Sequence, residues 1–427
     1  MRHWFLFTAA LVAALAAPAG AHPLGVSTNS LEDPTFGNVH LYAPAGTPKA
    51  MIMLLSDGNG FGSEERILAH SLRLRGNLVV GLDWPASRRG GVNHLSMTCA
   101  DFANRVEALA LTVERARNIE PYLTPVLAGV GLGSATAQAL APEAASHKIA
   151  GVGALRSPAM VSDDSPFCHS SAAIPPESPA LREVKEDDDG AAGEAVEALA
   201  AAGGPHGPGD LADLPLTVMM AHRPPTRMAV LLTGDGGLGP FDRRLADALV
   251  ERGVMVTILD SRRYFWATRN PDAVAADIRR IIRHFRASTP VERVALVGYS
   301  FGADYLPLAW NRLPAATRRV VAVVSLLGLA PATDMRIELS DDQYANSTPL
   351  LPEVAQIDAP QVQCLYGKDD APAAEACPAA ALARPDFDVR STDGGHNFNN
   401  DVARLADIIV APLLAAEPAV HHIRHPG

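Results

Sequence analysis

The second half of the chain alternates short apolar runs with longer stretches in which apolar positions recur at helical spacing. The apolar runs are Met228–Thr233, Val254–Leu259, Val291–Val297 and Val320–Leu327, and the helical stretches are Phe241–Arg252 and Pro271–Ala287. Runs of the first kind are typical of buried strands, and strands separated by helices form a parallel sheet with helices on both faces. The pattern therefore predicts an α/β fold with a doubly wound, mostly parallel sheet.

The first half repeats the opening of this pattern. Leu54–Gly60 matches Leu231–Gly237 at a separation of 177 residues, and Leu82-Asp83 matches Leu259-Asp260 at the same separation. A fixed separation between similar segments indicates a duplicated unit. We therefore expect two domains of the same fold, at residues 22–171 and 211–416.

The segments outside these domains differ from them in composition. Residues 172–210 contain prolines, glycines, alanines and an acidic run but few large apolar residues, which predicts a disordered linker. Residues 1–21 combine Arg2, a short apolar run and the small residues Ala19-Gly20-Ala21, which is typical of a signal peptide cleaved after Ala21. The mature protein is then expected in the periplasm, with residues 417–427 as a tail.

Gly298-Tyr299-Ser300-Phe301-Gly302 lies between a predicted strand and a predicted helix. G-x-S-x-G in that context is the nucleophile elbow of α/β-hydrolases, in which the turn presents the serine oxygen above the sheet. The N–H of Phe301 and the positive end of the helix are suited to a developing oxyanion. The aligned position in the first half is Gly131, which has no nucleophile, so we expect the first domain to be a degenerate, non-catalytic copy.

The other groups of a catalytic triad follow in the order acid, then histidine. Asp369 and Asp370 come after the predicted strand that ends at Gly367, and His396 follows Gly394-Gly395. A histidine takes the serine proton, and a carboxylate holds its tautomer and offsets its charge. We predict His396 as the base and Asp370 as the acid, with Asp369 as the alternative.

A second glycine-rich loop follows the strand Met228–Thr233. It comprises Gly234, Asp235, Gly236 and Gly237. α/β-Hydrolases place their other oxyanion N–H on the loop after this early strand, where glycine allows the backbone to approach the substrate. The alternative for this segment is an ordinary glycine turn.

Composition narrows the range of functions. The 427 residues carry a formal net charge of −11, which argues against binding of a nucleic-acid backbone. The four cysteines suit an oxidising compartment and predict one disulfide within each half, Cys99 with Cys168 and Cys364 with Cys377. The alternative is four buried thiols. We expect no metal site and no cofactor.

Several of these motifs together resemble the AcvB/VirJ family of exported bacterial proteins. The matching segments are 298–304, Asn311–Pro314, Asp260–Trp266, Gln363–Gly367 and Gly394–Phe398. The duplicated layout is similar to the two-domain AcvB type. The resemblance implies hydrolysis of lysyl-phosphatidylglycerol, a membrane phospholipid, with Ser300 as nucleophile and His396 as general base. The chain departs from the family pattern at Leu238, where a tryptophan is usual, and at Asn397, where a second histidine is usual.

A lysyl ester is consistent with the residues around the predicted site. Asp304 and Asp235 are candidates to pair with an ammonium group, although carboxylates near helix starts and turns are common for structural reasons. Tyr299 and Tyr264 are candidate substrate contacts, with core packing as the alternative for Tyr264. Two other functions stay open: a generic carboxylesterase or lipase, and a non-enzymatic accessory protein of a type IV secretion system with secretion proteins as partners.

Overall fold

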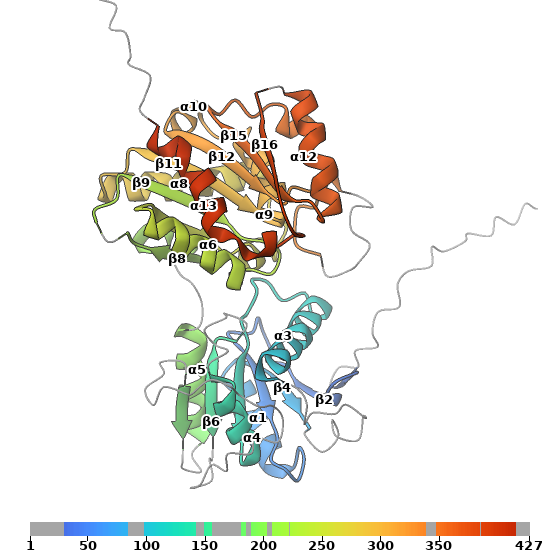
Figure 1. The fold of residues 1–427 in the computed structure, drawn as a ribbon. Helices are drawn as coiled ribbons and strands as arrows, with labels where there is room; N and C mark the ends of the chain where they lie inside the picture. Colours follow the sequence, from blue (N-terminus) through green and yellow to red (C-terminus); the bar gives the residue numbers. More distant parts are fainter. Residues whose placement is uncertain are drawn as a thin grey trace, which may run out of the picture.

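The chain forms two α/β domains, each built on a seven-stranded sheet (Figure 1). The structure, a computed structural model, describes residues 30–83, 98–141, 149–155, 181–184, 189–202, 207–221, 223–338, 347–384 and 386–415. The predicted signal peptide and tail lie outside these residues. The duplicated, mostly parallel α/β architecture predicted from the sequence is confirmed.

The second domain has strand order β16-β15-β12-β11-β9-β10-β8, and only β8 runs antiparallel to its neighbour in this sheet. Its strands are β8 (Leu216–Met219), β9 (Arg227–Leu232), β10 (Met255–Leu259), β11 (Arg293–Tyr299), β12 (Val321–Leu327), β15 (Val362–Gly367) and β16 (Asp388–Thr392), with a separate two-stranded sheet of β13 (Ala332–Thr333) and β14 (Thr348–Pro349). The central strands are buried on both faces, which explains their continuous apolar runs.

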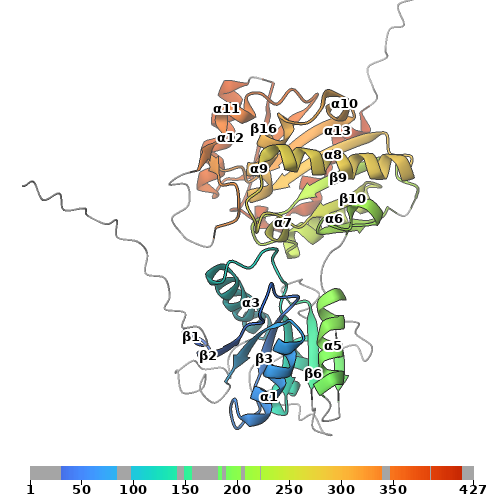
Figure 2. The same ribbon diagram turned by 180° about the vertical axis from the view of Figure 1, so that it is seen from behind.

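Helices cover both faces of this sheet (Figures 1 and 2). They are η3 (Gly209–Leu211), α6 (Pro240–Glu251), α7 (Ser261–Tyr264), α8 (Pro271–Ser288), α9 (Phe301–Trp310), α10 (Ala315–Arg318), α11 (Leu351–Val354), α12 (Ala371–Ala383), η4 (Phe398–Asn400) and α13 (Val402–Leu414). α8 shows why the sequence starts a helix where it does. The Asn270 side chain accepts the N–H of Ala273, and Pro271 occupies the first turn, where it loses no hydrogen bond.

The first domain has strand order β1-β2-β4-β3-β5-β6-β7. Its elements are β1 (Ser30–Asp33), β2 (Gly37–Tyr42), β3 (Met51–Leu55), α1 (Ser63–Leu74), β4 (Leu78–Leu82), α3 (Cys99–Ala116), β5 (Val126–Val130), α4 (Leu132–Ala139), β6 (Gly151–Leu155), β7 (Leu181–Val184) and α5 (Asp189–Ala202). The segment β3-α1-β4 followed by β5-α4-β6 repeats β9-α6-β10 followed by β11-α9-β12. The two domains therefore share the framework that carries the elbow.

The prediction of a disordered linker at 172–210 is wrong for residues 181–184 and 189–202. β7 pairs in parallel with β6, and α5 packs on the same sheet through Ala192, Val196 and Leu199. Alanine has the highest helix propensity, and a helix of small residues can lie close to a sheet without large apolar side chains. Composition alone therefore underestimated how much regular secondary structure this segment forms.

α3 joins the first domain to the second. The guanidinium of Arg115 lies 3.6 Å from the ring centroid of Trp266 and donates to the carbonyl oxygens of Trp266 and Ile337. The indole N–H of Trp266 in turn donates to Ile119. Trp266 is fully buried and packs with Leu111 and Tyr122 of the first domain, so the motif Asp260–Trp266 supplies an apolar contact between the domains.

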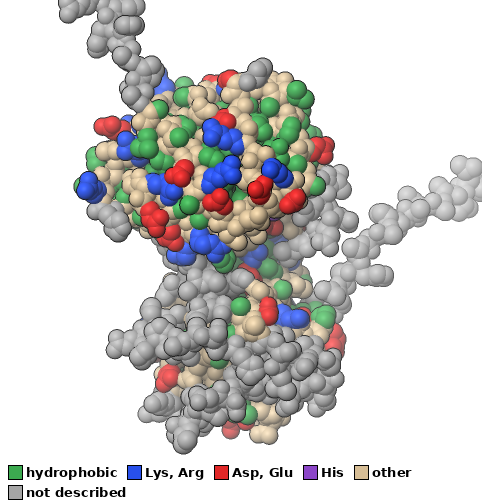
Figure 3. All heavy atoms as spheres, in the orientation of Figure 1, with side chains coloured by type: hydrophobic (Ala, Val, Ile, Leu, Met, Phe, Trp, Pro, Cys, Tyr) green, Lys and Arg blue, Asp and Glu red, His purple; other side chains and the backbone are tan. Residues whose placement is uncertain are grey.

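The face of the second domain seen in Figure 3 carries acidic and basic side chains interspersed rather than a single basic field. Within the described ranges, no helix is both long and apolar enough to cross a membrane.

Candidate active site

Ser300 lies on a sharp turn between β11 and α9. Its backbone has φ 53° and ψ −123°, a conformation that residues with a side chain rarely adopt. The two flanking glycines make room for the turn: a Cβ on Gly298 would lie 2.4 Å from the carbonyl oxygen of Gly302, and one on Gly302 would lie 2.3 Å from that of Leu232. The elbow therefore requires both glycines of the motif, and it presents Ser300 at the carboxyl edge of the sheet.

Asp370 and His396 form a hydrogen-bonded pair at the same edge. The Oδ2 atom of Asp370 lies 2.8 Å from Nδ1 of His396. The Asp370 side chain is buried, whereas that of His396 is half exposed. Asp369, the alternative acid, is exposed, and its backbone N–H donates to Gly394. The structure thus brings Asp370 rather than Asp369 to the histidine.

His396 lies close to the elbow through two neighbours. Its ring centroid is 5.3 Å from that of Tyr299, and a Cβ on Gly328 would lie 2.9 Å from its Cε1 atom. Gly328 follows Leu327, whose carbonyl oxygen accepts the N–H of Ser300. Both residues are described, and no hydrogen bond joins the Ser300 hydroxyl to His396. Such contacts often tighten only when substrate is bound.

The loop Gly234–Gly237 passes directly beside Ser300. A Cβ on Gly234 would lie 3.2 Å from the Ser300 Cβ atom, so a glycine is needed for this close approach. The N–H of Gly237 closes the turn on the carbonyl oxygen of Gly234, and Arg262 donates to the carbonyl oxygen of Asp235. This loop and the N–H of Phe301 at the start of α9 are therefore placed as an oxyanion hole would be.

A cavity of about 90 Å³ opens beside the nucleophile. It is lined by Asp235, Ser300, Phe301, Asp304, Thr333, Asp334, Arg336, Ile337 and Glu338. The predicted contacts Asp235 and Asp304 are both present. The residues at 333–338 were not found from the sequence, because they belong to no motif and reach the site only through the fold after β12. Four of the nine residues are acidic and one, Arg336, is basic and donates to Glu338 at 2.6 Å. The lining therefore keeps an excess of carboxylates, which favours a cationic or strongly polar ligand.

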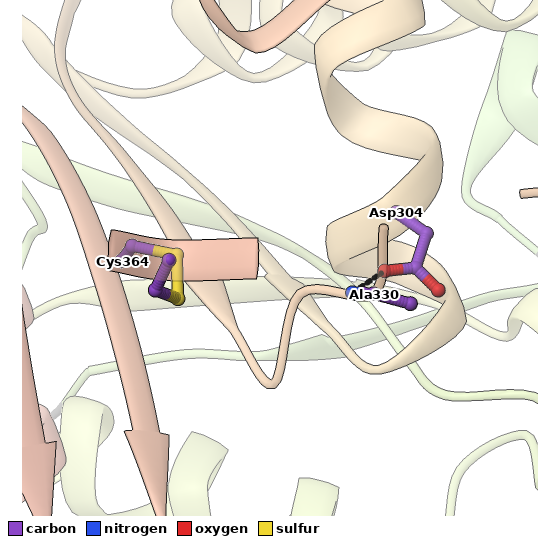
Figure 4. Close-up of a disulfide and its surroundings, with 4 residues drawn as sticks. Asp304, Ala330 and Cys364 are labelled. Atoms are coloured by element: carbon purple, nitrogen blue, oxygen red, sulfur yellow. Dashed lines mark hydrogen bonds between the residues drawn. A yellow bond between two sulfur atoms is a disulfide. The ribbon is translucent and has the colours of Figure 1, made fainter. Parts of the chain in front are cut away.

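Asp304 is buried at the base of this cavity. Its carboxylate accepts the N–H of Ala330 at 2.7 Å (Figure 4). Burial raises the pKa of Asp304 well above its usual range, and the nearby Asp235 and Asp370 raise it further. Burial therefore favours the neutral form of Asp304, and a cation bound next to it would stabilise the charged form.

Two predicted substrate contacts do not reach the cavity. Tyr264 is buried in the core, and its hydroxyl donates to Asp277 at 2.6 Å. Tyr299 packs against Phe241 and His396, and its hydroxyl donates to Asn397. Core packing, the alternative stated for Tyr264, holds for that residue, while Tyr299 packs against the ring of the histidine instead of lining the cavity.

The predicted disulfide of the second domain is confirmed. Cys364 on β15 is bonded to Cys377 on α12, so the bridge ties together the two elements on either side of Asp370 (Figure 4). Cys99 of the first domain is also disulfide-bonded, and its predicted partner Cys168 lies outside the described residues. Among the side chains that the structure describes, no cluster has the composition of a metal site.

The corresponding turn of the first domain is blocked. Gly131 stands at the elbow, and the Asp57 carboxylate accepts the N–H of Leu132 at 3.0 Å. A Cβ added to Gly131 would lie 2.4 Å from that carboxylate oxygen. Asp57 aligns with Gly234 of the second domain, so the first domain has both lost its serine and filled the adjacent space.

Comparison with known protein families finds a match in the second domain. Residues 226–417 match the family model described as bacterial virulence protein (VirJ). No curated protein matches the chain.

Among solved structures, the chain is similar to MenH from S. aureus (12% identity, 46% of this chain and 97% of the other, TM-score 0.37). It is also similar to Est1E from Butyrivibrio proteoclasticus with ferulic acid bound (13% identity, 46% and 92%, TM-score 0.36). A third similarity is to proline iminopeptidase from Mycobacterium smegmatis (11% identity, 46% and 94%, TM-score 0.35).

Proposed function

Since residues 226–417 match the VirJ family model, we propose that this protein is a serine hydrolase of ester bonds. The observation that carries the proposal is the arrangement of the three triad residues. Ser300 lies in the strained turn, and His396 is hydrogen-bonded to buried Asp370. An accessory protein without enzymatic activity would require neither the serine turn nor the His396–Asp370 pair.

The residues support an acyl-transfer sequence. His396 takes the proton of Ser300 as its oxygen attacks the ester carbonyl, and Asp370 holds the Nδ1–H and stabilises the imidazolium. The N–H groups of Phe301 and of the Gly234–Gly237 loop receive the oxyanion. The alcohol leaves with the proton from His396, and water then releases the acyl group by the same steps.

We propose an aminoacyl phospholipid, lysyl-phosphatidylglycerol, as the substrate. The support is the acidic lining of the cavity, with Asp235, Asp304 and Asp334 around Ser300, because a lysyl group carries two amines that a carboxylate recognises well. An aminoacyl ester is also activated, so the triad and the oxyanion hole suffice without a cofactor. The protein would then act in the periplasm on lipid presented by the membrane surface.

A comparison of three substrates tests this proposal. The purified chain, given lysyl-phosphatidylglycerol, alanyl-phosphatidylglycerol and p-nitrophenyl acetate, should hydrolyse the lysyl lipid about ten- to hundredfold faster than the alanyl lipid. One charge-assisted contact contributes about 1.5–3 kcal/mol, which corresponds to that ratio. Asp304→Asn should reduce the preference more than it reduces hydrolysis of the neutral ester.

Two results would replace the proposal. Equal rates on all three substrates would indicate a generic esterase. Failure to hydrolyse any of them, together with an unreactive Ser300, would favour an accessory role in a secretion system.

A further inference from the structure

Asp242 lies in the first turn of α6, immediately after the loop that passes beside Ser300. Its side chain is almost completely buried. The Oδ2 atom accepts the N–H of Gly239 at 3.2 Å, and the carboxylate also faces the N–H of Gly234. Among the described residues, its other oxygen has no hydrogen-bond partner. One carboxylate therefore reaches both ends of the loop that begins at Gly234 and ends where α6 starts.

The first domain contains the same arrangement with a longer side chain. The two carboxylate oxygens of Glu65 accept the N–H of Asp57 at 3.1 Å and the N–H of Gly62 at 2.8 Å. At the 177-residue separation, Asp57, Gly62 and Glu65 correspond to Gly234, Gly239 and Asp242. The carboxylate is thus present in both copies of the loop, but in only one copy does the loop lie beside a serine.

The electrostatic setting of Asp242 is unfavourable to its charge. Burial raises its pKa to about 7, against the lowering effect of the N–H groups of Gly239 and Gly234, and Asp260 after β10 adds a like charge. Tyr299 on β11 is the other titratable group that faces it, and Asp242 raises the pKa of that phenol.

We propose that Asp242 is a positioning residue for hydrolysis, whose carboxylate holds the loop Gly234–Gly237 in its working geometry against Ser300. This inference rests on the proposed function. The carboxylate accepts the N–H of Gly239 at the far end of the loop and attracts the N–H dipole of Gly234 at the near end, which favours one direction of the peptide groups between them. The loop passes close to the nucleophile: a Cβ added to Gly234 would lie 3.2 Å from the Cβ atom of Ser300. A small rotation of the peptide group at Gly234 would therefore displace an oxyanion donor.

The test uses the full chain with p-nitrophenyl acetate as the probe, between pH 5.5 and 8.5. Asp242→Asn should lower kcat about tenfold at pH 8.5 with KM within about twofold, since a misplaced oxyanion donor acts on the transition state. As the pH falls through about 7, the wild-type carboxyl takes up a proton and also becomes neutral. The ratio of wild-type to variant kcat should therefore approach one at pH 5.5.

Glu65→Gln is the matched control, because it removes the same carboxylate from the domain that has no nucleophile. Its kcat should equal that of the wild type at every pH. A ratio for Asp242→Asn that stays constant across the pH range, or an equal loss in Glu65→Gln, would overturn the inference and leave a purely structural role.

Asp242→Glu keeps the test decisive if the asparagine variant does not fold. Glutamate performs this task at position 65, so the variant should retain kcat within about threefold and keep the wild-type pH profile; a folded variant with kcat reduced more than about tenfold would contradict the proposal. An active wild type with a constant ratio would contradict only this inference. A wild type that neither hydrolyses the ester nor reacts with a fluorophosphonate would contradict the proposed function, and this inference with it.

Discussion

The two elbows of the chain have nearly the same backbone conformation but carry different residues: a glycine beside a carboxylate in the first domain, and a serine beside a glycine in the second. Gly131 has φ 55° and ψ −119°, and Ser300 has φ 53° and ψ −123°. In the first domain the carboxylate of Asp57 is bound to the N–H of Leu132, whereas in the second domain Gly234 leaves the space beside Phe301 open to the cavity. The turn is thus part of the fold itself, and the chemistry depends on two positions.

The blocked elbow also shows what the open one is built to bind. The N–H of Leu132 corresponds to that of Phe301, and it donates to a negatively charged oxygen of the protein's own. The fold therefore directs this N–H toward an anion even where the turn carries no serine. In the second domain we expect the developing oxyanion to occupy that position.

The largest expected effect comes from exchanging the residues at the two elbows. Ser300→Ala should lower kcat by about a million-fold, because loss of a triad nucleophile leaves only the oxyanion hole and binding. Gly131→Ser should add no activity, since its Cβ would lie 2.4 Å from an Asp57 oxygen. Steady-state hydrolysis of p-nitrophenyl acetate by the folded variants measures both. Activity retained in Ser300→Ala would remove this serine from the mechanism.

The acid is the next most sensitive position. Asp370→Asn should lower kcat by about four orders of magnitude, because an amide favours the wrong tautomer of His396. Asp369→Asn is the control one residue away, and its exposed side chain should matter little. Measurement of kcat for the two variants under the same conditions ranks them. The reverse ranking would assign the role to Asp369.

Introducing the Asp57 carboxylate of the first domain at the equivalent position of the second domain should obstruct the site at Ser300. Gly234→Asp places a carboxylate where Asp57 stands in the first domain, next to the N–H of Phe301. We expect kcat to fall by about a hundred- to a thousandfold, which is typical when one oxyanion donor is lost. The reciprocal change Asp57→Gly should leave kcat unchanged. If Gly234→Asp remained fully active, the correspondence between the two loops would be incorrect.

The last prediction concerns stability at the contact between the domains rather than catalysis. Burial raises the pKa of Glu114 on α3 to about 9 from its ordinary value of 4.5, so the folded chain binds a proton that the unfolded chain releases. The free energy of unfolding should therefore decrease as the pH rises from about 4.5 to 9, by at most about 1.4 kcal/mol per pH unit from this group.

Glu114→Gln should remove that contribution, and denaturant unfolding at several pH values measures the difference from the wild type. A difference that does not grow with pH would show that Glu114 is ionised in the folded chain.

The sequence predicted the features of this molecule that depend on short local motifs. The elbow, the Gly-Gly-His loop and the Cys364–Cys377 bridge each occupy short segments whose residue types have few other uses. The duplication was visible because β3 and β9 end in similar loops. These features follow from backbone constraints that only glycine, or a strand followed by a helix, can satisfy.

The remaining features depend on long-range placement. The lining residues Arg336 and Glu338 reach the cavity through an irregular segment after β12, and Trp266 became an interdomain anchor because α3 packs on it. Tyr264 was mistaken for a substrate contact because an aromatic after a strand can turn to either side. α5 was taken for linker because alanine carries little apolar surface in a composition count.

Labelling with a fluorophosphonate tests the central claim most directly, since the reagent marks a serine only where a base and an oxyanion hole activate it. The full chain, treated with the reagent and digested, should carry one adduct on Ser300, and the His396→Ala variant should carry none. An adduct on a serine of the first domain, or no adduct at all on the folded wild type, would contradict the assignment of one working elbow and one blocked one.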